Sequence, residues 1–258
     1  MAIGAVGRRA LAQAPAQEDP WPALTGQIFD GRPIQDGGAI LAIDAPYRAE
    51  DAALVPVGIH ALSPAGDARR IRAITLVIDE NPSPVAAMFS PGAASGMRSL
   101  STRVRVDSYT NLHAVAELTD GQLYAAQRFV KGAGGCSAPA AKPEADAIPL
   151  GTMHFRQFPS APNANPELRE AQLMIRHPNY SGMQMDQLTR LYVPAHFVQS
   201  LRLWLGDDLL LAIESGISIS ENPVYRFDYH PNGATDFCAE MKDSEGLAFS
   251  QQWPVTRA

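Results

Sequence analysis

The sequence predicts an all-β protein of two β-sandwich domains joined by a glycine-rich, cysteine-bearing arm. Short apolar or alternating runs recur along the chain, and turn-forming Gly, Pro, Asn and Asp residues separate them. No segment has convincing helical periodicity. A Gly-rich and then Ala/Pro-rich stretch, residues 131–149, divides the runs into two sets. Many short strands with regular turns are typical of β-sandwiches.

The first set covers residues 21–130, with Trp21 beginning the ordered part. Residues 71–78 are β-branched and apolar almost throughout, which indicates a central strand buried on both faces. Residues 101–106 alternate, which indicates a strand with one buried face, and residues 119–122 are a hairpin turn signal. The predicted strands are 28–33 (running into a turn), 40–43, 54–60, 71–78, 85–90, 101–106, 112–117 and 123–130.

The second set covers residues 150–258 and also predicts a sandwich. Alternation is clear over residues 195–205, and Gly/Asp/Asn-rich turns follow at 206–208, 231–233 and 244–246. The predicted strands are 153–158, 173–177, 195–205, 209–214, 224–229, 236–241 and 247–253.

Composition and charge exclude two classes of protein. The 258 residues carry a formal net charge of −6, so no basic face is available for nucleic acid. No apolar run is long enough to span a membrane. Residues 1–20 are Ala/Gln/Pro-rich and read as a disordered tail; alternatively, the small-x-small stretch 12–14 marks the remnant of an export signal.

Cys136 is the candidate functional residue. It follows Gly132, Gly134 and Gly135, so the sequence places a thiol on a segment that we expect to be mobile and to reach into another protein's active site. The other interpretation is a linker in which the cysteine is incidental. Cys238 lies in a strand-like run and is expected to be structural; the alternative is a disulfide between the two cysteines in an exported protein.

The remaining titratable residues predict no catalytic or metal site. None of the six histidines stands at paired spacing, so we expect no metal and no cofactor; His177 and His196, beside prolines, are expected to bond to backbone. Arg103 and Arg105 belong to the solvated face of their strand, or alternatively face an anionic group or a partner. No base adjoins Cys136, which favours a passive carrier over an enzyme.

The layout resembles the SoxY and SoxZ sulfur-carrier proteins of thiosulfate oxidation, fused in one chain. The arm Val130-Lys131-Gly132-Ala133-Gly134-Gly135-Cys136 is similar to the Gly-Gly-Cys swinging arm of SoxY. The SoxY-like stretches are 79–84, 101–105 and 119–121, and the SoxZ-like stretches are 175–178, 193–198 and 220–223. In SoxY the arm ends the polypeptide, whereas here Ser137-Ala138-Pro139 continues into the second domain, so the arm is held at both ends.

The resemblance implies two immunoglobulin-like sandwiches that pair within one chain. It implies a periplasmic carrier, not itself an enzyme, that binds a sulfur group covalently on Cys136 and presents it to sulfur-oxidising or quinoprotein redox enzymes. We expect a monomer, because fusion makes the pairing intramolecular. The alternative is a non-catalytic accessory module of a quinoprotein (PQQ) dehydrogenase system, with no covalent cargo.

Overall fold

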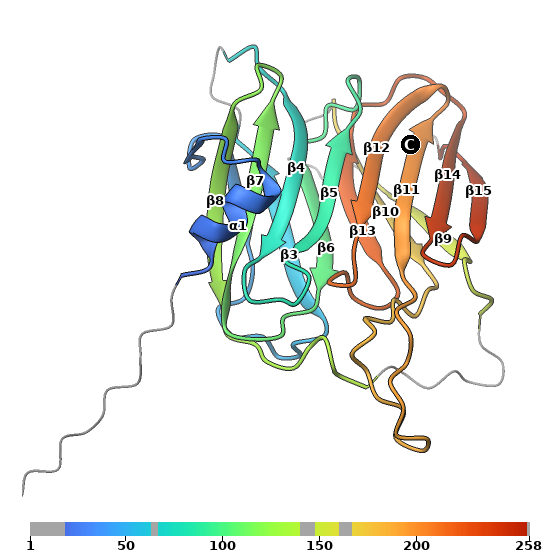
Figure 1. The fold of residues 1–258 in the computed structure, drawn as a ribbon. Coiled ribbons are helices and arrows are strands. Elements are labelled where there is room, and N and C mark those ends of the chain that lie inside the picture. The colour runs from blue at the N-terminus through green and yellow to red at the C-terminus, as the bar shows by residue number, and fades with distance from the viewer. Residues whose placement is uncertain (1–18, 63–66, 140–147, 160–166, 257–258) are drawn as a thin grey trace, which may run out of the picture.

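The computed structural model describes residues 19–62, 67–139, 148–159 and 167–256, which are almost all strand and turn (Figure 1). The expected tail, except residues 19 and 20, and residues 140–147 of the predicted linker lie outside the described residues. The first half contains α1 (Trp21–Ile28), β1 (Ile34–Asp36), β2 (Leu41–Asp44), β3 (Val55–Ala61), β4 (Ile71–Ile78), β5 (Val85–Pro91), β6 (Ser99–Val104), β7 (Thr110–Leu118) and β8 (Leu123–Val130). The second contains β9 (Met153–Phe158), β10 (Arg169–Ile175), β11 (Val198–Leu205), β12 (Asp208–Ser215), β13 (Val224–Tyr229), β14 (Asp236–Asp243) and β15 (Ala248–Pro254).

The strands form two sheets, and each sheet runs through both halves of the chain. The larger has the order β1-β8-β7-β4-β5-β12-β11-β14-β15, and the smaller β2-β3-β6-β13-β10-β9. The halves meet where β5 pairs antiparallel with β12 and β6 pairs antiparallel with β13. The two sandwiches therefore lie edge to edge and continue one another, as Figure 1 shows.

One hydrophobic core lies between the sheets and extends through both halves. It includes Leu76 and Phe89 of the first half and Leu203 and Tyr225 of the second, all almost fully buried. The strand predicted over 71–78 is confirmed as β4, and the turn predicted at 119–122 joins β7 to β8. The β-sandwich class predicted from the sequence is therefore confirmed, with the addition that the two sandwiches share their sheets.

The N-terminal segment differs from the expectation. A strand over 28–33 and no helix were predicted, but Trp21–Ile28 forms α1, on the outer face of the larger sheet. Trp21, Leu24 and Ile28 are spaced for one helical face, and they pack on a small cluster that includes Val77 and Val115. The helix is therefore stabilised by packing on the outer face of the sheet, which the local sequence does not show. Among the described residues no helix has both the length and the apolar content that crossing a membrane needs.

Candidate functional site

The arm after β8 packs against the first sandwich through its backbone. The Lys131 amide donates to the carbonyl of Tyr47 at 2.8 Å, and its carbonyl accepts from Ala49. Farther along, Gly134 donates to the Asp107 carbonyl at 2.9 Å and Gly135 to the Val106 carbonyl at 3.0 Å. The arm thus continues as an ordered ribbon beside the segment that follows β6.

Two glycines of the arm are required by this path. Gly134 has φ +75°, a backbone conformation that other L-residues rarely adopt. A Cβ on Gly135 would lie 2.1 Å from the carbonyl oxygen of Ala52, so only glycine fits there. Gly132 is buried against Val106 and Ala49 without so close an approach. The glycines were expected to make the arm mobile; in the structure they let it pack closely, and the expectation of an extended arm is wrong for this state.

Cys136 lies at the end of this ribbon, in a seat formed by both halves of the chain. Its amide donates to the Asp107 carboxylate at 3.3 Å. Its carbonyl accepts a hydrogen bond from the Ser181 hydroxyl, which comes from the second half. Ser181 in turn accepts from the Met183 amide at 3.2 Å. The arm is therefore fixed on one side by the first half and on the other by the second.

The seated thiol is neutral and inaccessible. Cys136 is 0% exposed. Burial, and then the charge of Asp107, raise the pKa of the Cys136 thiol to about 12, and Arg105 offsets only part of this rise. Both cysteines are free thiols, and Cys238 lies on β14 as predicted, although it is partly exposed rather than buried. The seat thus keeps Cys136 protonated while the arm is in place.

Arg105 is part of this seat rather than of a solvated face. Strand β6 ends at Val104, and Arg105 is 1% exposed. Its Nη1 donates to the carbonyls of Ile217 (3.2 Å) and Ile219 in the second half. The alternation predicted for 101–106 is right for Thr102 and Val104, but it fails at Arg105, because there the chain leaves the sheet and carbonyls of the other half draw the guanidinium inward.

Asn81 positions the segment that carries Arg105 and Asp107. Its Nδ2 donates to the Arg105 carbonyl at 2.8 Å and to the Ser218 hydroxyl at 2.9 Å. Its Oδ1 accepts from the Asp107 amide at 2.9 Å. One buried amide side chain therefore ties both edges of the seat together across the two halves.

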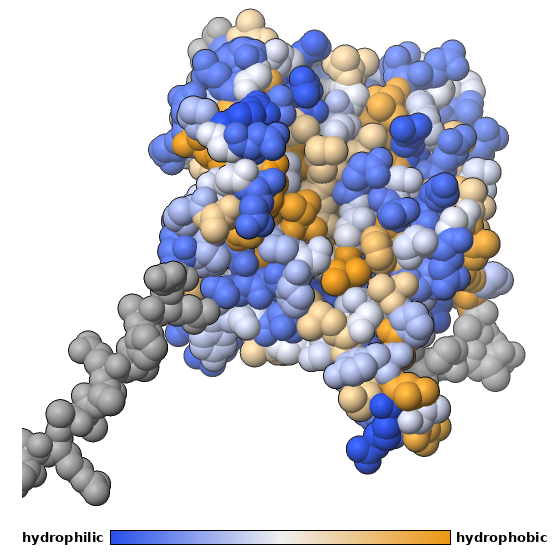
Figure 2. Space-filling model, viewed as in Figure 1, coloured by the Kyte–Doolittle hydropathy of each residue, from blue (hydrophilic) through white to orange (hydrophobic). Residues whose placement is uncertain are grey.

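A projecting hairpin begins at the seat. Residues 180–196 leave the sandwich between β10 and β11, paired at Tyr180–His196 and Met185–Tyr192. Its tip exposes several large apolar side chains, and part of the lower projection in Figure 2 is orange. These are Met185, Leu188, Leu191 and Tyr192. Ser181 lies at the base of this hairpin, so the apolar tip and the thiol belong to one end of the molecule.

The base of the hairpin also gathers two histidines and an aspartate. The ligand atoms of His177, His196 and Asp243 all lie within 4.8 Å of one another. His196 Nε2 lies 2.8 Å from Asp243 Oδ2, and His177 Nε2 lies 3.7 Å from the same oxygen. The sequence, in which these residues stand far apart, predicted no such cluster.

The hydrogen bonds of this cluster, here called the histidine clamp, fit a structural role better than a metal site. His177 Nδ1 accepts the Asn179 amide proton at 3.1 Å, as expected for a bond to backbone. A neutral His177 therefore carries its proton on Nε2. In a metal site Nε2 would instead bind the metal without a proton, and the other ring nitrogen, Nδ1, would carry a proton and donate it. His196 Nε2 is hydrogen-bonded to Asp243, whereas His177 Nε2 is buried without a hydrogen-bond partner among the described residues. The pKa of His177 falls to about 4, first through burial and then through His196.

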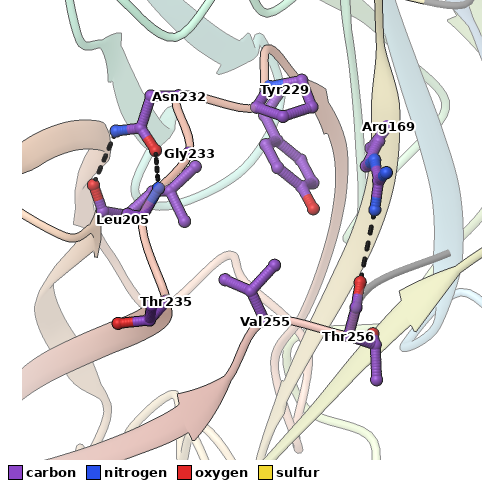
Figure 3. A pocket seen from close by; sticks show the side chains of 10 residues that line it. Arg169, Leu205, Tyr229, Asn232, Gly233, Thr235, Val255 and Thr256 are labelled. Carbon is purple, nitrogen blue, oxygen red and sulfur yellow. Dashed lines mark hydrogen bonds between the residues drawn. The ribbon is translucent and has the colours of Figure 1, made fainter.

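A separate cavity lies in the second half, at the far end of β11 from the hairpin (Figure 3). Its volume is about 330 Å³. Tyr229 and Arg169 line it together with Leu205, the last residue of β11. Val198, at the other end of that strand, donates to Asn179 beside the seat. The cavity is therefore remote from Cys136.

Sequence reasoning proposed Cys136 and its glycines as the site but did not predict the residues that enclose them. Asn81 lies in the stretch 79–84 that resembles SoxY, which was the one signal pointing to it. Asp107 and Ser181 stand in turn-like segments without a motif. Their roles depend on contacts between distant segments, which no local pattern records.

Two family models match the chain, one in each half. Residues 25–136 match "Sulfur oxidation protein SoxY" and residues 156–254 match "Sulphur oxidation protein SoxZ". The first match ends at Cys136 itself. No curated protein sequence matched the chain.

Among solved structures, the chain is similar to the sulfur carrier protein SoxY from Chlorobium limicola f thiosulfatophilum. The identity is 30%, covering 43% of this chain and 94% of that one, with a TM-score of 0.34. Two single-residue variants of superoxide reductase (neelaredoxin) from Ignicoccus hospitalis match at 23% and 21% identity. They cover 37% and 43% of this chain and 82% and 90% of theirs, with TM-scores of 0.29 and 0.28.

TM-scores this low carry no argument, so the assignment rests on the two family models. SoxY and SoxZ are carrier proteins of sulfur oxidation. The two models follow one another along a single polypeptide. The chain therefore belongs to the SoxY and SoxZ sulfur-carrier family, as a fusion of the two proteins.

Proposed function

We propose that this chain is a periplasmic carrier that holds a sulfur group covalently on Cys136 and presents it to partner redox enzymes. The observation that carries the proposal is the position of Cys136: a free thiol at the end of the SoxY-matched segment, on an arm that the second half holds through Ser181. The SoxZ-like half supplies part of the seat, so the fusion keeps both parts of the seat in one chain.

Loading and presentation require the arm to leave its seat. With a pKa of about 12, the seated Cys136 is almost entirely protonated at pH 7, whereas an ordinary thiol is a few per cent ionised. The thiolate is the nucleophile in sulfur transfer. The seated state is therefore a resting state, and the arm reacts after it has moved out.

The chemistry of loading is a displacement at sulfur. With tetrathionate as a probe, the Cys136 thiol gives its proton to solvent and the thiolate attacks a central sulfur atom. A bond forms between Sγ and that sulfur, the central S–S bond breaks, and thiosulfate leaves with the bonding electrons. Cys136 then carries an anionic S–SO₃⁻ extension. Tetrathionate is itself the two-electron oxidant, so no other oxidant is needed.

The surroundings of the thiol support a carrier rather than an enzyme. The ionisable groups that act on Cys136 are Asp107 and Arg105. Asp107 opposes ionisation of the thiol and Arg105 is not a base, so this seat does not generate a nucleophile. We propose that the chain has no catalysis of its own, works as a monomer, and serves sulfur-oxidising or quinoprotein redox enzymes.

One observation favours a second candidate function. Complete burial of Cys136 also fits an accessory module of a quinoprotein dehydrogenase that carries nothing on its thiol. Intact mass after incubation with tetrathionate, with the modified residue mapped, separates the two. The carrier gains one reducible adduct on Cys136 in the wild type and none in Cys136→Ser. Cys136 that stays free when the folded protein is treated, yet reacts once it is unfolded, supports the accessory module.

A further inference from the structure

Arg105 is a buried cation next to the thiol seat. It is 1% exposed and Nη1 is bonded to two backbone carbonyls, while Nε is buried without a hydrogen-bond partner among the described residues. A guanidinium stays protonated in proteins, so its charge is buried with it. Carbonyl dipoles offset such a charge only in part, and a buried charge is costly without an anion nearby.

The same contacts that hold the arm place the thiol beside this cation. Gly135 bonds to Val106, the residue after Arg105, and Cys136 bonds to Asp107. On the other side, Asn179 Nδ2 donates to the Ile219 carbonyl at 3.4 Å, the same oxygen that Arg105 uses. Ser181, two residues on, bonds to Cys136. Guanidinium and thiol are thus enclosed by the same two segments.

The charges around Arg105 leave a role for an anion at Cys136. Burial lowers the pKa of Arg105, and negative charge on Cys136, then on Glu221, raises it. The free thiol is neutral in the seat, so in the unloaded protein Cys136 supplies no negative charge to stabilise the Arg105 guanidinium. The Asp107 carboxylate accepts a hydrogen bond from the backbone amide of Cys136, and its charge opposes a negative charge on the thiol itself.

We propose that Arg105 binds the anionic end of the sulfur group carried on Cys136, so that the loaded arm returns to its seat. This inference rests on the proposed carrier function and assigns the residue that holds the charged end of the carried group in the seat. An S–SO₃⁻ group carries its charge on oxygen atoms beyond Sγ, where the forked donors of arginine bind an oxyanion better than a point charge does. Ser137 and Pro139 are exposed, which leaves room for the arm to shift outward around the added atoms.

The test compares loading in the wild type with loading in variants of Arg105. Wild type, Arg105→Lys and Arg105→Gln are treated with tetrathionate, the adduct is confirmed by mass, and the melting temperature is measured before and after loading. Arg103→Gln, two residues earlier and within β6, is the matched control. Since each variant is compared with its own unloaded form, any general destabilisation by the substitution cancels.

Loading is expected to raise the melting temperature of the wild type and of Arg103→Gln, and to lower that of Arg105→Gln, with Arg105→Lys in between. Reduction of the adduct is expected to be about tenfold faster in Arg105→Gln, the usual effect of losing a charged hydrogen bond. Equal loading shifts and reduction rates in wild type and Arg105 variants overturn the inference. A wild type that acquires no adduct overturns the carrier function itself. If Arg105→Gln fails to fold, Arg105→Lys gives the same comparison.

Discussion

At the scale of single residues, the sequence singled out Cys136 as the candidate but did not predict that its thiol is buried. The glycines before Cys136 were read as a source of mobility, since glycine has the greatest conformational freedom of any residue. The same glycines also permit close packing, and Gly135 is used that way against the Ala52 carbonyl. Composition cannot separate these two uses, because the contact that distinguishes them comes from a residue far away in the chain.

Gly135→Ala is expected to displace the arm. A Cβ at this position overlaps the carbonyl oxygen of Ala52, which is backbone and cannot turn aside. Cys136 should then be exposed, and its reaction with a thiol reagent should be at least about tenfold faster at pH 8, as its pKa returns toward the ordinary value. Gly132→Ala is the control, because its Cβ meets only side-chain atoms, at 3.3 Å or more. Equal rates in both variants would contradict the seat.

The seated thiol predicts a loss of stability in alkali. Burial and then Asp107 raise the pKa of Cys136 from 9.0 to about 12, so the native state keeps a proton that the unfolded chain has lost. The unfolded state binds fewer protons in this range, and stability falls as the pH rises through it. The stability difference between wild type and Cys136→Ser, measured by urea unfolding, should therefore shift against the wild type between pH 8 and pH 10. A difference independent of pH argues against the raised pKa.

At the scale of elements, local patterns predicted strands well and long-range packing poorly. Residues 71–78 and the turn at 119–122 were predicted correctly, because a β-branched run and an Asp-Gly turn depend on nearby residues. Helix α1 was missed, since its apolar face is short and is stabilised by packing on an apolar patch on the outer face of the sheet. The hairpin of residues 180–196 was also missed, and its base supplies Ser181 to the seat.

Ser181→Ala is expected to loosen the arm without displacing it. The variant leaves the carbonyl of Cys136 without the hydroxyl that bonds to it, and loss of a buried hydrogen bond costs about 1–2 kcal/mol. Modification of Cys136 by a thiol reagent should become about fivefold to thirtyfold faster. Thr189→Ala, at the exposed tip of the same hairpin, loses a hydroxyl bond to Asp186 and should leave the rate unchanged. A rate that rises equally in both variants would show a general loosening of the hairpin.

The histidine clamp predicts an acid-labile hairpin base. Burial, and then His196, lower the pKa of His177 from 6.5 to about 4. Between these two pH values the unfolded chain is protonated at His177 and the native state is not. Stability from this group is complete above about pH 6.5 and is lost as the pH falls toward 4. His177→Gln should flatten the fall in unfolding free energy between pH 6.5 and 4.5, whereas the exposed His154→Gln should not. An unchanged slope in His177→Gln would place the acid sensitivity elsewhere.

At the scale of the whole molecule, the halves are more closely joined than the sequence indicated. Two sandwiches connected by an arm were predicted, because the arm separates two sets of strands and each set has its own turn signals. The structure adds the β5–β12 and β6–β13 pairings, which make both sheets continuous. Nothing in either strand's own pattern marks its partner, since an edge strand and a central strand with both faces covered can have the same alternation. The arm and the seat of Cys136 therefore lie on a shared framework.

This continuity predicts that the halves unfold together. Phe89 of β5 lies opposite Ile213 of β12 and is fully buried, so Phe89→Ala should lower the free energy of unfolding by about 3–5 kcal/mol. In a Trp21→Phe background, fluorescence reports only Trp204 and Trp253, both in the second half. Although Phe89 belongs to the first half, its substitution should move this second-half transition to lower urea by the same amount as the transition seen by circular dichroism. Phe129→Ala, at a partly exposed position, is the control and should move both only slightly. A fluorescence transition that stays in place while the dichroism shifts would mean that the halves are independent, and that the seat between them opens by separation of the domains rather than by movement of the arm.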